Sequence, residues 1–152
     1  MAKFRVVGLK RAVSNIQNKV NRIVQSETNL RKIGDEIIEE IQESTEAYRN
    51  PKTGRGYKKY SKEYAKQKGV SRRQVDLRLT GRMMESLKAK VKRKEGKGAV
   101  SVDVTGARNK KLAGYHQNGT DKMPARPFMF ISKKTLSRII NKLKKDILKR
   151  FN

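Results

Sequence analysis

The chain has 152 residues, a length that favours a single domain with a modest hydrophobic core. Its 39 lysines and arginines outnumber 14 acidic residues, and the net charge of +25 creates a field that attracts polyanions of any sequence. Cysteine is absent, which excludes disulfides and thiolate metal sites, and no apolar run approaches the roughly 20 residues that cross a membrane.

The first third of the chain is expected to be helical, because its apolar residues recur at a spacing of three and four. Glu27 and Gly34 interrupt this stripe, and Ser26 offers N-cap chemistry. The pattern predicts two helices, at about 10–25 and 28–48. The stripe favours packing on the protein's own sheet over a coiled coil with a partner, because sustained coiled coils rarely break their seam with glycine.

Acidic residues are concentrated in one segment of this basic chain. Residues 35–46 hold six acids and no base. These carboxylates are candidate partners for arginines elsewhere in the chain, within the subunit or across an interface.

Three tyrosines, Tyr57, Tyr60 and Tyr64, stand among lysines in the middle of the chain. Basic residues interleaved with aromatic ones can bind nucleic acid by stacking on its bases. The alternative, which we favour, is a short helix that lays one tyrosine face on the core and exposes its lysines. Residues 66–78 are basic and poor in apolar residues, which predicts an exposed, mobile loop.

The sheet is expected to begin after a short helix. Thr80 is placed to cap a helix over 81–87, and a strand should start at 88–91. A charged hairpin loop follows at 92–98. Residues 99–104 alternate strictly between apolar and polar positions, which predicts a strand with its valines facing the core.

A basic loop is expected at 106–111, and the uncharged run at 112–117 is interpreted as a further strand. The Asn-Gly pair at 118–119 is a strong turn signal, because both residues tolerate positive φ. Pro124 and Pro127 then restrict the backbone, so the segment after the turn should be a rigid extended arm, here called the proline arm (residues 120–130).

The chain is expected to close on a helix capped by Ser132, with one apolar stripe and a face of lysine and arginine. A basic amphipathic helix can lie on a membrane, but a sheet also needs a helix to cover it, and we favour the second interpretation. Together the elements predict an α+β domain, with N-terminal helices and a C-terminal helix packed on one small antiparallel sheet of about three to five strands. The single domain divides into a helical N-terminal part (1–48), a basic loop region (49–78), the sheet with the proline arm (79–131) and the C-terminal helix (132–152).

No enzyme constellation is apparent around His116, the only histidine of the chain. A catalytic serine triad would need a partner carboxylate and an oxyanion hole, and a metal site made of His116 and Asp121 alone lacks ligands. A single histidine in a strand is more often a hydrogen-bonded structural residue. A phosphate-binding glycine motif is also missing. We therefore expect no enzymatic activity, no cofactor and no metal.

Four motifs and a helix cap follow one another in a family-like order. They are Leu-Thr-Gly-Arg at 79–82, Met-Glu-Ser-Leu at 84–87, Tyr-His-Gln-Asn-Gly-Thr at 115–120, Pro-Ala-Arg-Pro-Phe at 124–128, and then Ser132. This order resembles the tail-completion or virion-morphogenesis proteins of tailed bacteriophages, and it is similar to the related neck and minor tail-component family of long-tailed phages. The resemblance covers roughly residues 28–150.

The resemblance implies a structural protein of the phage neck or tail end, which completes the tail and joins it to the DNA-filled head. Such a protein would be part of a homo-oligomeric ring around the DNA channel, expected to be hexameric. Its expected neighbours are a head–tail connector or adaptor and a tail terminator or tail tube protein, with electrostatic contact to packaged DNA and no membrane partner. We expect it in the virion, after synthesis in the host cytoplasm. The alternative is a nonspecific nucleic-acid-binding protein, for which the basic field alone would suffice.

Two arginines stand out within these motifs. Arg82 and Arg126 are each flanked by residues that restrict the backbone, so each can hold a guanidinium ready for bidentate pairing with a carboxylate. The candidate partners are Glu85, Asp103 and the acids of 35–46. Phe128 either anchors an interface with a neighbouring subunit or folds back into the local core, and the sequence leaves both readings open.

The predicted functional residues form two sets. The interface candidates are Arg82, Tyr115, His116, Arg126 and Phe128. The candidates for contact with DNA or another polyanion are Arg72, Arg73, Lys92, Arg93, Lys94, Lys110 and Lys111.

Overall fold

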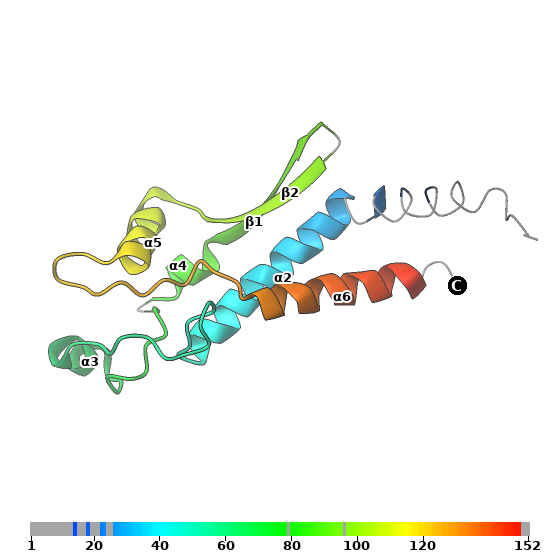
Figure 1. Ribbon diagram of the computed structural model, residues 1–152. Coiled ribbons are helices and arrows are strands. Elements are labelled where there is room, and N and C mark those ends of the chain that lie inside the picture. Colours follow the sequence, from blue (N-terminus) through cyan, green and yellow to red (C-terminus); the bar gives the residue numbers. More distant parts are fainter. Residues whose placement is uncertain are drawn as a thin grey trace, which may run out of the picture.

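The computed structural model shows an α+β fold in which helices flank a two-stranded antiparallel hairpin (Figure 1). It describes residues 26–78, 80–95 and 97–149, together with Ser14, Asn18, Arg22 and Ile23. In chain order the elements are α2 (Glu27–Glu46), α3 (Lys62–Lys68), α4 (Arg82–Glu85), β1 (Leu87–Lys94), β2 (Lys97–Val104), α5 (Ala107–Asn118) and α6 (Lys133–Lys149). The predicted fold class is confirmed, whereas the helix predicted at 10–25 lies outside the continuously described residues.

The hairpin pairs over its full length, from Leu87 opposite Val104 to Lys94 opposite Lys97. The predicted sheet of three to five strands is wrong for the described residues, which contain one sheet of two strands. The predicted loop at 92–98 is also too long, because β1 continues to Lys94 and β2 begins at Lys97.

One face of the hairpin packs against α2 and the other faces solvent. Val104 is buried and Val102 half-buried, whereas Ser101 and Asp103 are exposed, which confirms the alternation predicted for this strand. Four lysines of β1 share the exposed face with these polar residues: Lys88, Lys90, Lys92 and Lys94. The hairpin therefore presents a basic outer face.

The helix predicted at 28–48 is present as α2, which continues through Gly34 although this glycine interrupts the apolar stripe. Ser26 caps the helix as expected, since its Oγ accepts a hydrogen bond from the Asn29 N–H at 3.3 Å. A Cβ atom on Gly34 would lie 2.4 Å from Cβ of Ala89 and 2.9 Å from Cγ2 of Val100. The glycine thus allows helix and hairpin to approach closely, and it serves packing rather than helix termination.

α6 lies beside α2 (Figure 1). Ser132 caps it as predicted, with Oγ accepting from the Thr135 N–H at 3.0 Å. The buried residues of α6 are Ile139, Leu143 and Ile147, spaced by four, so they form the stripe that the sequence indicated.

Three acids of α2 form ion pairs inside the subunit. The pairs are Glu36 with Lys142, Glu40 with Arg138, and Glu46 with Arg78. One side chain of each pair is more than half exposed, so each pair adds at most about 1 kcal/mol to stability. Two of the three basic partners lie on α6 and the third, Arg78, precedes α4; none of them is Arg82 or Arg126.

The short helix predicted over 81–87 is present as α4, but its predicted cap is wrong. Gly81 occupies the N-cap position with φ of 78°, and no side chain forms a capping hydrogen bond there. Thr80 is exposed beside it. Because a glycine has no side-chain acceptor, this helix begins through backbone geometry alone.

The segment before the proline arm differs most from the prediction. The sequence indicated a basic loop at 106–111 and a strand at 112–117, and both are wrong, because α5 covers them. A short uncharged run has no clear hydrophobic period, so its sequence does not distinguish a helix from a strand. Here contacts with the core select the helix. The helix ends at the predicted turn, where Gly119 has φ of 78° and donates its N–H to the Tyr115 carbonyl at 2.8 Å.

Phe128 of the proline arm is fully buried in the core. The predicted exposed loop at 66–78 is wrong in its second half, because Val75 and Leu77 are buried in the same cluster. Two apolar side chains among many charged ones were enough to draw this segment inward.

The tyrosines belong to the core, as the favoured interpretation predicted. Tyr57 and Tyr60 are buried, although both precede α3 rather than lying on it. Tyr64 is half-buried, and its ring centroid lies 4.8 Å from that of Tyr60 in an edge-to-face arrangement.

Candidate functional site

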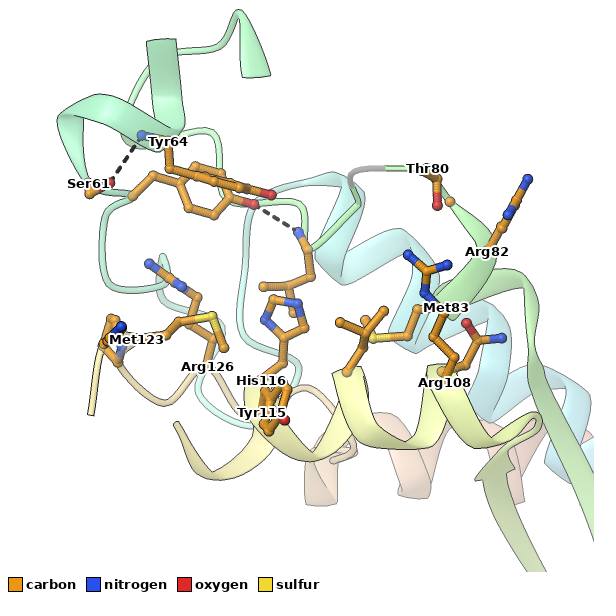
Figure 2. Close-up of a pocket in the computed structure, with 17 residues that line it drawn as sticks. Ser61, Tyr64, Thr80, Arg82, Met83, Arg108, Tyr115, His116, Met123 and Arg126 are labelled. Atoms are coloured by element: carbon orange, nitrogen blue, oxygen red, sulfur yellow. Dashed lines mark hydrogen bonds between the residues drawn. The ribbon is translucent and has the colours of Figure 1, made fainter. Parts of the chain in front are cut away.

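A pocket of about 500 Å³ opens where α3, α4, α5 and the proline arm meet (Figure 2). We call it the motif pocket. Its lining residues come from four segments: 60–64, 77–83, 108–116 and 122–126. Three of these segments carry motifs that the sequence singled out, and they come from two distant parts of the chain, 79–82 and 115–128. The fold therefore gathers the motifs around one cavity.

α5 supplies one wall of the motif pocket. Arg108, Asn109, Leu112, Tyr115 and His116 line it, and their spacing of one, three and four places them on one face of the helix. The predicted strand would have sent consecutive residues to opposite faces. The helix instead brings neighbouring candidates such as Tyr115 and His116 to the same cavity (Figure 2).

The proline arm supplies the opposite wall and folds back along α5. Gly119 begins the reversal, and a Cβ atom there would lie 2.8 Å from the Ala125 nitrogen. The Arg126 N–H then donates to the His116 carbonyl at 2.6 Å, and the Phe128 N–H donates to Oε1 of Gln117 at 3.1 Å. In the single chain the arm is thus held by its own subunit.

Arg126 lies beneath this wall and is 3% exposed. Its Nε donates to the Lys58 carbonyl and its Nη2 to the Lys59 carbonyl, both at 2.9 Å. Its guanidinium carbon also lies 5.0 Å from the centroid of the Tyr60 ring. The predicted pairing of this arginine with a carboxylate is wrong, because two backbone carbonyls take its place. Burial lowers the pKa of Arg126, but a guanidinium remains charged in proteins.

His116 is half-buried in the pocket wall, and its Nδ1 atom has no hydrogen-bond partner among the described residues. The expectation of a hydrogen-bonded structural histidine is therefore wrong at this atom. Burial, with the nearby charges of Arg126 and Lys68, lowers the pKa of His116 to about 4. The imidazole is neutral at pH 7, which suits a site already crowded with cations.

The lining of the motif pocket contains four cations and no carboxylate. Arg126 is buried, while Arg82, Arg108 and Lys122 are exposed and form no ion pair with any described residue. The carboxylate predicted for Arg82 is therefore missing from the part of the chain that the structure describes. Asp103, one of the expected partners, pairs instead with Lys90 at 3.0 Å on the hairpin.

The remaining lining is aromatic and apolar. It includes Tyr60, Tyr64 and Tyr115, together with Leu112, Met83 and Met123. Tyr115 is 39% exposed, so part of its ring is accessible at the pocket. Burial raises the pKa of Tyr60 and that of Tyr64, which is less deeply buried. Both phenols therefore stay protonated at neutral pH.

The predicted interface residues do not all share one environment. Arg82, Tyr115, His116 and Arg126 line the motif pocket, whereas Phe128 lies behind it in the core. A role for these residues at an interface stays a prediction, since no neighbouring subunit is present.

The predicted polyanion contacts lie on three segments. Arg72 and Arg73 are exposed in the turn after α3, and Arg72 also donates from Nε to the Tyr60 carbonyl at 2.9 Å. Lys92, Arg93 and Lys94 are exposed at the far end of β1. Lys110 and Lys111 are exposed on α5, not on a loop as expected. The structure does not gather these residues into one patch.

Sequence reasoning missed Arg108 and Lys122 as site residues. Arg108 precedes Leu112 by four residues and Tyr115 by seven, which is a helical spacing. That signal was available, but it was hidden once the segment had been interpreted as a loop followed by a strand.

In the described residues no helix is long and apolar enough to cross a membrane. Within the same parts of the chain, no group of three or more histidine, cysteine or acidic residues could hold a metal ion.

Comparison with known proteins gives one match. The model of the phage virion morphogenesis family matches residues 6–148, which is nearly the whole chain. No curated protein and no solved structure matches the chain. The match agrees with the family that the four motifs resembled, and it includes every segment of the motif pocket. The chain belongs to the phage virion morphogenesis family.

Proposed function

We propose that this protein is a structural component of the phage neck or tail end, which completes the tail and joins it to the DNA-filled head. Its role in phage morphogenesis follows from the family. The observation that carries the finer proposal is the convergence of motifs from two distant parts of the chain on one pocket with cationic and apolar lining. Such a lining suits recognition of another protein, and we infer no enzymatic activity.

In this proposal the protein acts as a homo-oligomeric ring, with six copies as the expected number. Its neighbours are a head–tail connector or adaptor on one side and a tail terminator or tail tube protein on the other. Identical subunits of net charge +25 repel one another, so a ring needs anionic partners nearby. Packaged DNA in the channel and acidic neighbours would both lower that repulsion.

The direct test is a phage that cannot make the protein. We expect infected cells to accumulate filled heads and free tails, which electron microscopy distinguishes from complete particles. Adding the purified protein to such an extract should restore infectious particles. Normal particles in its absence would contradict the proposal, and so would tails that fail to form at all.

Nonspecific nucleic-acid binding is a second candidate function, favoured by the row of exposed lysines on β1. Size-exclusion chromatography with light scattering separates the two. A ring component should assemble alone or with its neighbours, whereas a simple binder should stay monomeric until DNA is added.

A further inference from the structure

We propose that the motif pocket is a docking site for a peptide segment of a different virion protein, in which a carboxylate stands next to an apolar side chain. This inference rests on the proposed function, because it needs an assembled particle. It adds the location and the chemistry of one contact.

The charge of the pocket lining points to a carboxylate. Arg82, Arg108 and Lys122 are exposed in a lining without any acid, and none of them forms an ion pair in the described structure. Arginine offers a planar fork that matches a carboxylate with two hydrogen bonds. Arg82 and Arg108 come from two elements, α4 and α5, that pack against each other, and both side chains line the same pocket.

The shape and apolar part of the lining point to a side chain beside that carboxylate. The cavity holds about 500 Å³, which is within the range of recesses that enclose a ligand. Met83, Met123 and Leu112 line it together with Tyr115. Methionine side chains adapt their shape to an apolar partner, and an accessible tyrosine ring adds contact area at low entropic cost.

Duplex DNA fits this site less well than a peptide does. The phosphates of a duplex lie on a convex surface, so they could contact the exposed cations but would leave Met123 and Leu112 uncovered. The exposed outer face of β1 is the better surface for such a contact, because its lysines stand in a row without a recess.

A second copy of this chain is also a poor occupant. Its acid-rich stretch is already folded as α2, and three of those acids pair within the subunit. The exposed acids outside α2 that lie in loops have basic neighbours in the sequence, as at Asp121, which Lys122 follows. These features favour an occupant that comes from another polypeptide.

The first experiment places a photo-cross-linking amino acid, p-benzoylphenylalanine, at Tyr115 in assembled particles. The matched control is the same substitution at Tyr48, which is 38% exposed against 39% for Tyr115 and does not line the pocket. We expect the Tyr115 position to cross-link to a segment of another virion protein that contains Asp or Glu beside an apolar residue, and the Tyr48 position to miss that segment. Cross-links only to DNA, only to a copy of this chain, or to nothing would overturn the proposal.

The second experiment uses a synthetic peptide of the cross-linked sequence and measures its binding to the free protein by fluorescence anisotropy. Replacing the acid by its amide in the peptide, or Arg108→Ala in the protein, should weaken binding by about five- to twentyfold. Arg55→Ala, which removes an exposed arginine outside the pocket, should leave binding unchanged. Equal binding by all variants would overturn the assignment of the pocket.

These outcomes are independent of the test of the proposed function. If the protein is needed to join heads and tails but the pocket variants join them normally, the function stands and the docking site fails. If joining never requires the protein, the proposed function fails first.

Discussion

The motif pocket and the β-hairpin use the same excess of positive charge in opposite ways. At the pocket, Arg126 is 3% exposed, and its guanidinium is hydrogen-bonded to two backbone carbonyls. On the hairpin, Lys92 and Lys94 are exposed on the face opposite α2, and no other described element packs against that face. A cation of the first kind stabilises the fold, whereas one of the second kind is available to a partner.

The difference between the motif pocket and the hairpin separates charges that stabilise the fold from charges that can bind a partner. Removing a charge that the subunit buries should change its free energy of unfolding. Removing an exposed charge such as that of Lys92 or Lys94 should change only the binding of the subunit to a partner. Substitutions at the two regions therefore have different expected results, and their sizes can be ordered.

The largest effect is expected for Arg126→Ala. It removes a buried cation and leaves the carbonyls of Lys58 and Lys59 without their donor, so the free energy of unfolding should fall by about 3 kcal/mol. Chemical denaturation of the purified subunit measures this change.

The matched control for Arg126 is Arg73→Ala, which removes an exposed arginine and should change stability by less than about 0.5 kcal/mol. If Arg126→Ala keeps its stability but fails to join heads to tails, the side chain acts at an interface instead.

The next effect concerns pH and His116. The pKa of His116 is about 4 in the folded subunit and about 6.5 in the unfolded chain, so between these values only the unfolded chain binds the proton. Stability should therefore fall as the pH decreases from 7 to 5, by about 2 kcal/mol. Denaturation curves across this window give the slope.

Replacement of His116 by Gln, which does not titrate, should make this slope shallower. Burial opposes ionisation of the nearby Asp76, but hydrogen bonds from Lys68 and the Arg78 N–H hold the pKa of this carboxyl below its ordinary value, so it titrates below the window. An unchanged slope in the variant would show that His116 is not the group responsible.

A smaller effect is expected where α2 crosses the hairpin. Gly34→Ala places a methyl group 2.4 Å from Cβ of Ala89, so the overpacking should cost about 1–2 kcal/mol despite the better helix propensity of alanine. Thermal unfolding is a sufficient measurement.

Gly114→Ala is the internal comparison for Gly34→Ala. Gly114 lies in α5, and a Cβ atom added there would meet nothing within 4 Å apart from its chain neighbours and the backbone of its own helix. The better helix propensity of alanine should therefore raise the stability by about 0.5–1 kcal/mol. If both substitutions changed the stability in the same direction, the packing explanation for Gly34 would be contradicted.

The smallest effect on the fold is expected on the hairpin. Reversing the charges of Lys92, Arg93 and Lys94 to Glu should change the free energy of unfolding by less than about 1 kcal/mol, because these side chains are exposed. If the free subunit binds DNA, the same variant should bind it more weakly and with a flatter dependence on salt. Titrations at several salt concentrations measure that slope, and an unchanged slope would move the DNA contact to Arg72, Lys110 or another segment.

The sequence predicted the elements whose signals are local. Ser26 and Ser132 each carry their own N-cap chemistry, and the alternation of Val102 and Val104 with polar residues specifies a strand. The order of the motifs also predicted the family.

Features that depend on distant contacts could not be predicted. Arg126 donates to carbonyls nearly seventy residues away in the chain, and no local pattern indicates that partner. The run at 112–117 is too short to fix its period, so its helical form, and with it the wall of the motif pocket, depends on packing. The motifs revealed which residues matter to the family, but only the fold shows that they meet.

Both strands of the hairpin are edge strands within the described structure, since β1 and β2 pair only with each other. An open edge invites pairing with another copy, and lysines along it discourage that association. If two hairpins met edge to edge, rows of like charge would stand about 5 Å apart. We therefore expect the exposed lysines of β1 to oppose pairing between the hairpins of free subunits.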